Sequence, residues 1–151
     1  MKSSDLMLGD WVRAKTVDYV DGVIKYVEEN KRATTAMIHQ LYNQETGVLK
    51  DSLYSIQVEP IELTPEILLK NGFNKDDYLA SQCYGREANH SVYSLLLENG
   101  NQVVTLDYCN KKIELEVATN AGRCLTIANG CYIHELQHAI KLCRIDKEII
   151  L

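Results

Sequence analysis

The sequence of 151 residues predicts an α+β protein, with an SH3-like small β-barrel over residues 1–62 and an α+β unit over residues 63–151. Three observations predict this architecture. Short runs rich in β-branched and aromatic residues, separated by turn signals, fill most of the first unit. A capped helix start follows the barrel segment. The rest of the chain reads as an antiparallel sheet packed by a C-terminal helix, and both units are expected to form one body.

Four or five short strands are expected in residues 1–62. The first follows Gly9, and the pair Asp21-Gly22 predicts a tight turn before the run VIKYVEE. The runs ATTAMIHQLY and SLYSIQVEPI, separated by the polar break NQETG, are interpreted as further strands. Trp11, the single tryptophan, is expected to be a core residue of the barrel rather than a surface on which a ligand stacks.

The run ELTPEILLKNGF predicts a short helix between the two units. Thr64 is placed to cap it, Pro65 suits the first helical position, and Glu66 complements the positive end of the helix. Gly72 supplies the stop. Ile67 and Leu68 are expected to face inward, so this helix of about two turns acts as a hinge.

An antiparallel sheet is predicted for the second unit. Asn99-Gly100 stands between the apolar runs SVYSLLLE and NQVVTLDYC, which is the strongest short-range signal for a hairpin. In IELEVAT the apolar residues Ile113, Leu115 and Val117 alternate with acidic ones, as expected for a sheet with one buried face. The run CLTIA adds a strand, and the terminal KEIIL is a candidate for the last one.

The final helix is predicted from about Tyr132 to Cys143. At about 100° per residue its apolar stripe gathers Ile133, Leu136, Ala139, Ile140 and Cys143. On that wheel His134 and His138 fall opposite the stripe. Both histidines are therefore expected on the solvated face of the helix.

The same helix contains H-E-L-Q-H, which has the spacing of the H-E-x-x-H zinc motif. A zinc hydrolase would use His134 and His138 as metal ligands and Glu135 as the base that activates a water. A third ligand is required, and the sequence does not single one out among Asp146, Glu148, Glu114, Glu116 and His90. The balance favours a surface helix, so no metal, cofactor or catalytic residue is expected, and zinc is the alternative.

A second arrangement for zinc pairs Cys131 with His134, joined by Cys124 or Cys143, but only one close ligand pair is present. The five cysteines form no C-x-x-C pair, and the sequence has no export signal. They are therefore read as reduced thiols. No G-x-S-x-G motif or phosphate-binding glycine loop is found.

Charge and hydropathy argue against two kinds of partner, nucleic acids and membranes. A net charge of −5 and scattered basic residues argue against nucleic-acid binding. The sequence has no signal-peptide h-region, and no run nears the ~18 apolar residues of a membrane span. A soluble, cytoplasmic protein is the resulting expectation.

Three segments, LMLGDWV, VEPIELTPEILLKNGF and YIHELQHAIKLCRIDKEIIL, are similar to a family of small uncharacterised proteins from gut anaerobes and their prophages. The resemblance covers about a third of the chain. In that family the residues at positions 135 and 138 vary, which implies that the zinc motif is coincidental here. Tyr132, His134, Leu136 and Gln137 then look like a structural set that locks the helix to the sheet.

The leading hypothesis is a non-enzymatic protein-binding or accessory protein of mobile-element origin. Its contact surface would be the open edge of the barrel or the tyrosine-bearing face of the sheet. The alternatives are the zinc hydrolase and, less favoured by charge, a nucleic-acid accessory module.

Overall fold

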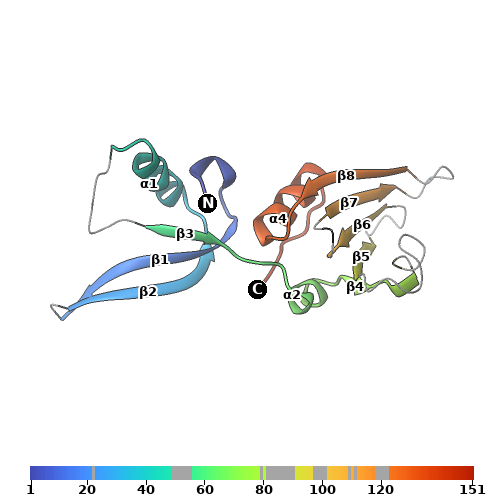
Figure 1. The fold of residues 1–151 in the computed structure, drawn as a ribbon, viewed down its shortest axis with the longest axis horizontal. Helices are drawn as coiled ribbons and strands as arrows, with labels where there is room; N and C mark the ends of the chain where they lie inside the picture. The colour runs from blue at the N-terminus through green and yellow to red at the C-terminus, as the bar shows by residue number, and fades with distance from the viewer. Residues whose placement is uncertain are drawn as a thin grey trace. The chain divides into compact units, whose positions relative to one another are not determined.

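The structure of the protein is a computed structural model that describes residues 1–21, 23–48, 56–78, 80, 91–96, 102–108, 110, 112–117 and 123–151 (Figure 1). The chain divides into two compact units, Met1–Ile61 and Glu62–Leu151. It has the mixed α+β composition expected from the sequence, with one antiparallel sheet in each unit. Each unit is described by itself. Within the described residues no helix has the length and apolar character needed to cross a bilayer.

The N-terminal unit is a three-stranded antiparallel sheet with a helix packed on one face (Figure 1). The strand order is β2-β1-β3. The two long strands pair from Val20 opposite Val23 to Trp11 opposite Arg32, which confirms the predicted hairpin, and Gly22 of its turn lies outside the described residues. Asp21 has a φ of 53°, as a two-residue hairpin turn requires. The elements are η1 Ser3–Asp5, β1 Trp11–Val20, β2 Val23–Arg32, α1 Thr35–Glu45 and β3 Gln57–Pro60.

Helix α1 corrects the prediction that the run ATTAMIHQLY forms a strand. The Thr34 hydroxyl accepts a hydrogen bond from Met37 N at 3.3 Å and caps the helix. Met37 and Leu41, four residues apart, lie on one helical face and are buried against the sheet. The cap and this spacing outweigh the β propensity of the threonines and isoleucine.

The core of the N-terminal unit lies between α1 and one face of the sheet. Val12 and Ala14 of β1 are fully buried there, with Val58 of β3 on the same face. β2 and β3 are the two ends of the sheet in the described residues, which therefore show an open sheet and no closed SH3-like barrel. In the predicted strand SLYSIQVEPI the second half forms β3, and residues 52–55 lie outside the described residues.

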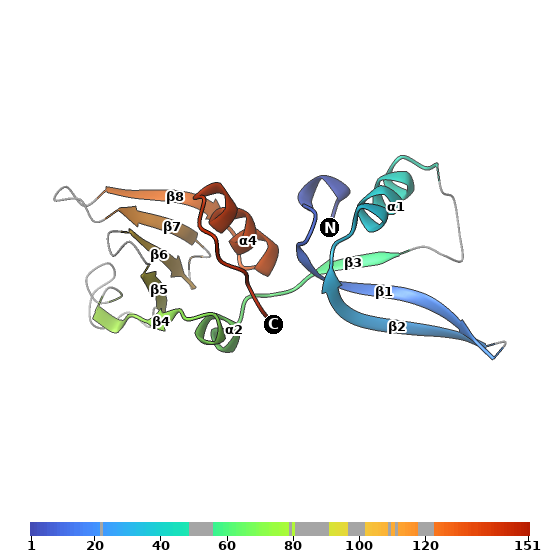
Figure 2. The ribbon, with the colours of Figure 1, turned by 180° about the vertical axis from the view of Figure 1, so that it is seen from behind.

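The C-terminal unit is a five-stranded antiparallel meander with the order β4-β5-β6-β7-β8 (Figure 2). Helix α4 contacts β8, the last strand of the sheet. The predicted β5–β6 hairpin is confirmed by the pairing of Leu96 with Val103, and its Asn99-Gly100 turn lies outside the described residues. The elements are α2 Pro65–Lys70, β4 Asn74–Lys75, β5 Val92–Leu96, β6 Gln102–Asp107, β7 Lys112–Val117, β8 Arg123–Asn129 and α4 Ile133–Leu142.

Helix α2 begins and ends as its sequence predicts. The Thr64 hydroxyl accepts from Ile67 N at 3.4 Å, Pro65 opens the helix, and Leu68 is fully buried. Gly72 has a φ of 79°, and the following Phe73 N–H bonds back to Leu68 O at 3.0 Å. This closes the helix with the left-handed glycine turn that favours residues without a Cβ atom.

The C-terminal segment corrects a second prediction. KEIIL was a candidate strand, but the segment pairs with no strand in the described residues. Instead the Asn71 side chain holds it: Nδ2 donates to Ile150 O at 2.8 Å and Oδ1 accepts from Ile150 N at 2.9 Å. Nδ2 also donates to Ile67 O at 2.8 Å. A side-chain amide therefore replaces the neighbouring strand, and it fixes Ile149 in the core.

Candidate functional site

The sheet of the N-terminal unit has one face packed by α1 and one face that carries polar and aromatic side chains. Cross-strand register places Lys15 opposite Glu28 and Gln57, Val17 opposite Tyr26, and Arg13 opposite Glu59. We call this set the open face. Its residues are Trp11, Arg13, Lys15, Val17, Tyr26, Glu28, Arg32, Gln57 and Glu59.

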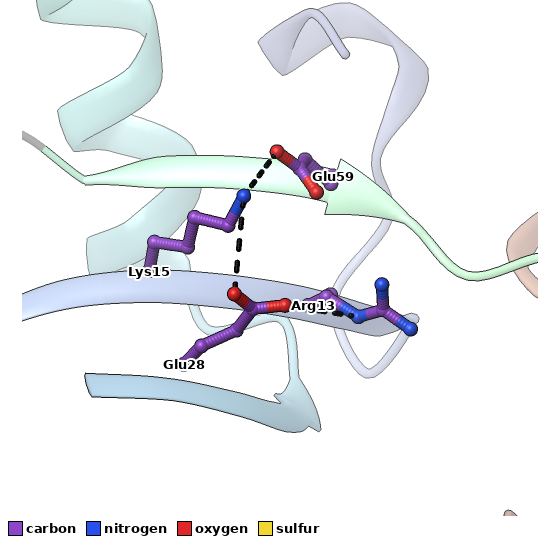
Figure 3. A network of polar contacts seen from close by, with 4 residues as sticks. All are labelled: Arg13, Lys15, Glu28 and Glu59. Atoms are coloured by element: carbon purple, nitrogen blue, oxygen red, sulfur yellow. Dashed lines mark hydrogen bonds and ion pairs between the residues drawn. The ribbon is translucent and has the colours of Figure 1, made fainter. Parts of the chain in front are cut away.

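Lys15 is the centre of a charged network that spans all three strands (Figure 3). Its ammonium nitrogen lies 2.7 Å from Glu59 Oε1 and 3.9 Å from Glu28 Oε2. The other oxygen of Glu28 lies 3.5 Å from Arg13 Nε. Two cations and two anions therefore alternate across the sheet. Exposed pairs stabilise a fold only slightly, so the main effect of the network is to hold these side chains in one arrangement.

The contact between Lys15 and Glu59 shifts the pKa of both groups. The hydrogen bond from Lys15 holds the pKa of the Glu59 carboxyl below its usual value, and the same bond raises the pKa of Lys15. Both groups are charged around neutrality. The pair is lost as acid protonates Glu59, because the lowered pKa reflects a bond made only by the carboxylate.

Replacing Lys15 with Met tests this contact. We expect the pKa of Glu59, followed by NMR of the side-chain carboxyl carbon during an acid titration, to rise toward its ordinary value, because Met cannot donate the hydrogen bond. Lys31→Met is the matched control, since Lys31 pairs with Glu29 and not with Glu59. An unchanged Glu59 titration in Lys15→Met would show that the pair does not form in solution.

Trp11 corrects the prediction that it is a core residue. It is half-buried on the open face, and the Arg32 guanidinium carbon lies 4.2 Å from the centre of a Trp11 ring. Arg32 Nη1 also donates to Gly9 O at 2.8 Å, which fixes the guanidinium in place. The strand alternation explains the outcome: Val12 takes the core position next in sequence, so Trp11 must face the other side.

A partly open pocket of about 260 Å³ lies on this sheet beside the charged network. Lys15, Val17 and Tyr26 line it, together with Val27, Glu28 and Gln57. Tyr26 is 84% exposed, the largest exposure among the exposed large hydrophobic side chains of the described residues. The pocket is smaller than the roughly 300–1,000 Å³ of a typical small-molecule site. Its size suits a single side chain of a partner.

The histidines of α4 are placed differently from the expectation that both face solvent. His134 is only 6% exposed, and His138 is half-buried. The His134 ring stacks on Tyr132 with centroids 5.9 Å apart, and it meets His138 edge-on at 5.8 Å. The buried surface of α4 also includes Gln137 and is therefore wider than the apolar stripe.

Glu135 has a structural role at the start of α4. Its Oε2 accepts a hydrogen bond from Tyr132 N at 3.0 Å, which satisfies one of the amides that the first helical turn leaves without a partner. An acidic residue at the third position of a helix is the usual partner for this bond. The acid in H-E-L-Q-H is thus accounted for by helix capping.

The structure describes only some of the side chains that the zinc alternative offers as metal ligands. Among the described residues no group of three or more His, Cys, Asp or Glu side chains is arranged to hold a metal ion. Asp146 and Glu148 are exposed. The side chains of Glu114, Glu116 and Cys124, and residue His90, lie outside the described part of the structure. Cys131 and Cys143 are free thiols, and burial raises the pKa of Cys143.

Sequence reasoning did not identify the open face as a site. The charged network joins residues 44 positions apart, and no local motif connects Lys15 with Glu59. One signal was available: Arg13 and Lys15 alternate with the apolar Val12 and Ala14 of β1, which indicates that the strand has a second, polar face. Comparisons of the chain with protein-family models, curated proteins and solved structures found no match.

Proposed function

We propose that the protein is a non-enzymatic binding or accessory protein that contacts another protein through the open face of its N-terminal unit. The observation that carries the proposal is the pocket of about 260 Å³ between the exposed Tyr26 ring and the Lys15 network. An origin in a prophage or other mobile element remains an expectation that rests on sequence resemblance.

The chemistry of the open face supports a protein partner. Tyrosine, tryptophan and arginine are the residue types that dominate the energy of protein interfaces. Here they are Tyr26, Trp11, Arg13 and Arg32. Two of them already form the Arg32–Trp11 stack, and Arg13 is paired with Glu28. A surface ordered before binding loses less side-chain entropy when a partner docks.

The experiment begins with a photo-crosslinking amino acid placed at Tyr26 in cells of the native host, with Tyr42 of α1 as the matched position. Tyr42 is 55% exposed and lies outside the open face. We expect one defined protein to be crosslinked from position 26 and not from position 42. The identified partner is then purified and its dissociation constant measured by calorimetry.

The binding measurement compares Tyr26→Ala with Tyr42→Ala. Loss of an interface hot spot weakens binding by about 30-fold or more. We expect this for Tyr26→Ala, with no change for Tyr42→Ala. Equal crosslinking from both positions, or equal affinity of the two variants, would place the contact elsewhere and contradict the proposal.

A further inference from the structure

Strand β2 is an exposed edge of the N-terminal sheet. It is ten residues long, pairs with β1 on one side, and is the end of the strand order in the described residues. Its first four residues and Glu28, Glu29 and Asn30 are exposed. Exposed edge strands of this length present backbone groups that can pair with another strand.

The backbone groups that point outward follow from the hairpin register. In an antiparallel hairpin closed by two residues, the pair next to the turn exchanges both of its backbone hydrogen bonds, and such pairs then alternate. Val23 pairs with Val20 in this way, so the odd-numbered residues of β2 bond to β1. The outward N–H and C=O groups belong to Ile24, Tyr26, Glu28 and Asn30.

We propose that the partner of this edge is β2 of a second copy of the chain, paired antiparallel about a two-fold axis at Val27. Two residues that face each other across paired strands have their side chains on the same side of the sheet, and side chains alternate along each strand. The two-fold axis must therefore pass through one residue of β2 and not midway between two neighbouring residues. With the axis at Val27, each Lys25 faces Glu29 of the other copy. Ile24 faces Asn30, and Tyr26 faces Glu28.

Charge selects this register over its neighbours. An axis at Glu28 would place two Glu28 carboxylates together and Lys25 opposite Lys31. An axis at Tyr26 would leave Lys25 opposite Val27, with no charge pair. Only the axis at Val27 gives two attractive Lys25–Glu29 pairs. Lysine on an edge strand normally opposes strand pairing, because pairing brings its charge against the neighbouring strand, but with the axis at Val27 each Lys25 meets an acid.

The pairing also explains the exposure of Tyr26. In the selected register the two Tyr26 rings are diagonal neighbours on the open face, within reach of aromatic side chains. The two Glu28 carboxylates are diagonal as well, and each is already paired with Arg13 and Lys15 of its own copy. The two three-stranded sheets become one sheet of six strands with a continuous open face.

Sedimentation equilibrium of the full chain, at concentrations up to about 1 mM, tests the dimer. In Lys25→Glu the new carboxylate of each copy faces Glu29 of the other copy, so both attractive pairs become repulsive. We expect the dimer dissociation constant to rise about tenfold or more. Glu29→Lys is expected to do the same. The charge-swapped double variant, Lys25→Glu with Glu29→Lys, restores the wild-type value, because both pairs are attractive again.

A cysteine at the axis tests the register independently of charge. Facing residues that are not hydrogen-bonded lie about 4.5 Å apart at Cα, within the range that a disulfide spans. Val27→Cys should therefore form a disulfide-linked dimer under oxidised glutathione, above the background of the wild-type cysteines. Glu29→Cys is the control, since its two copies would lie roughly 13 Å apart along the strands.

Several outcomes would overturn the proposal. They are a wild-type chain that stays monomeric across the concentration range, a double variant that fails to restore association, or equal crosslinking of the two cysteine variants. A different protein crosslinked from Tyr26 would support the proposed function even if the dimer failed, so the two proposals fail separately.

Discussion

Replacing Asn71 with Asp is expected to destabilise the protein by about 3 kcal/mol at pH 7. Asn71 is 4% exposed, and its amide nitrogen donates to two carbonyl oxygens, those of Ile67 and Ile150. Asp has nearly the same shape, but it presents a carboxylate oxygen where those two carbonyls need a hydrogen-bond donor. The buried charge and the loss of two hydrogen bonds both lower the free energy of unfolding.

The destabilisation should depend on pH. The carboxyl of the variant is buried beside carbonyl oxygens, and both features favour its protonated form, so its folded-state pKa lies above the unfolded value of about 3.9. The folded state therefore binds the proton more tightly. The difference from wild type is greatest above the folded-state pKa and shrinks as the pH falls toward the unfolded-state pKa. Urea unfolding followed by circular dichroism at pH 7 and pH 4.5 measures both values.

Lys70→Ala is the matched control for Asn71. Lys70 reaches the same terminal segment, where its ammonium group donates to Leu151 O, but its contact is exposed. Its loss should change the free energy of unfolding by no more than about 0.5 kcal/mol. Amide exchange supplies a local readout, since Ile150 N–H should lose its protection in Asn71→Asp but not in Lys70→Ala. Equal effects of the two substitutions would refute the assigned role of Asn71.

The elements that the sequence predicts well are those with local stop and start signals. Helix α2 is bounded by Thr64 and Gly72, each of which acts on backbone groups within a few residues. The hairpin at Asp21 is equally local. Helix α4 was expected from Tyr132 to Cys143, and these two residues are its caps. Element boundaries that depend on contacts between residues a few positions apart can be predicted from the sequence alone.

Helix α1 shows where local reading gave the wrong element. Its run contains β-branched and aromatic residues, and this composition on its own favours a strand. The Thr34 cap and the four-residue spacing of Met37 and Leu41 were present in the sequence and indicate a helix. The missing strand also removes one wall of the predicted barrel, so a single misassigned element changed the predicted architecture of the N-terminal unit.

The histidines and the open face could not be located from local patterns. A helical wheel places His134 opposite the apolar stripe, but it does not include the neighbours that cover the flank of the helix. Likewise, Lys15 and Glu59 meet only because β1 and β3 pair. Contacts between segments distant in sequence decide burial and charge pairing, and the sequence pattern of one segment does not specify them.

Replacing Gly130 with Ala is expected to destabilise the protein by about 1 kcal/mol, through Glu135. A Cβ atom at position 130 would overlap the Glu135 carboxylate. That carboxylate is the flexible end of a side chain and can move, but moving it breaks the capping bond to Tyr132 N. The cost of Gly130→Ala should therefore equal the cost of losing the cap.

A double-mutant cycle isolates this coupling. Glu135→Ala alone should also cost about 1 kcal/mol, because the Tyr132 amide loses its acceptor. The two changes together should cost no more than either alone, because Glu135→Ala removes the carboxylate with which the new Cβ atom at position 130 would clash. Alanine also restricts the unfolded chain more than glycine does, and this effect favours the folded state. Urea unfolding of the four proteins gives the coupling energy directly. Additive costs would mean that Gly130 and Glu135 do not act on each other.

Glu135→Gln separates the structural role of this residue from a catalytic one. Glutamine keeps an oxygen that accepts from Tyr132 N, so the variant should stay within about 0.5 kcal/mol of wild type. A hydrolase base, by contrast, depends on the carboxylate itself, and the same change would abolish its activity. The close fit of Gly130 against Glu135 ties the acid of H-E-L-Q-H to the turn between β8 and α4. That requirement for an acceptor oxygen holds whether or not the two imidazoles bind a metal.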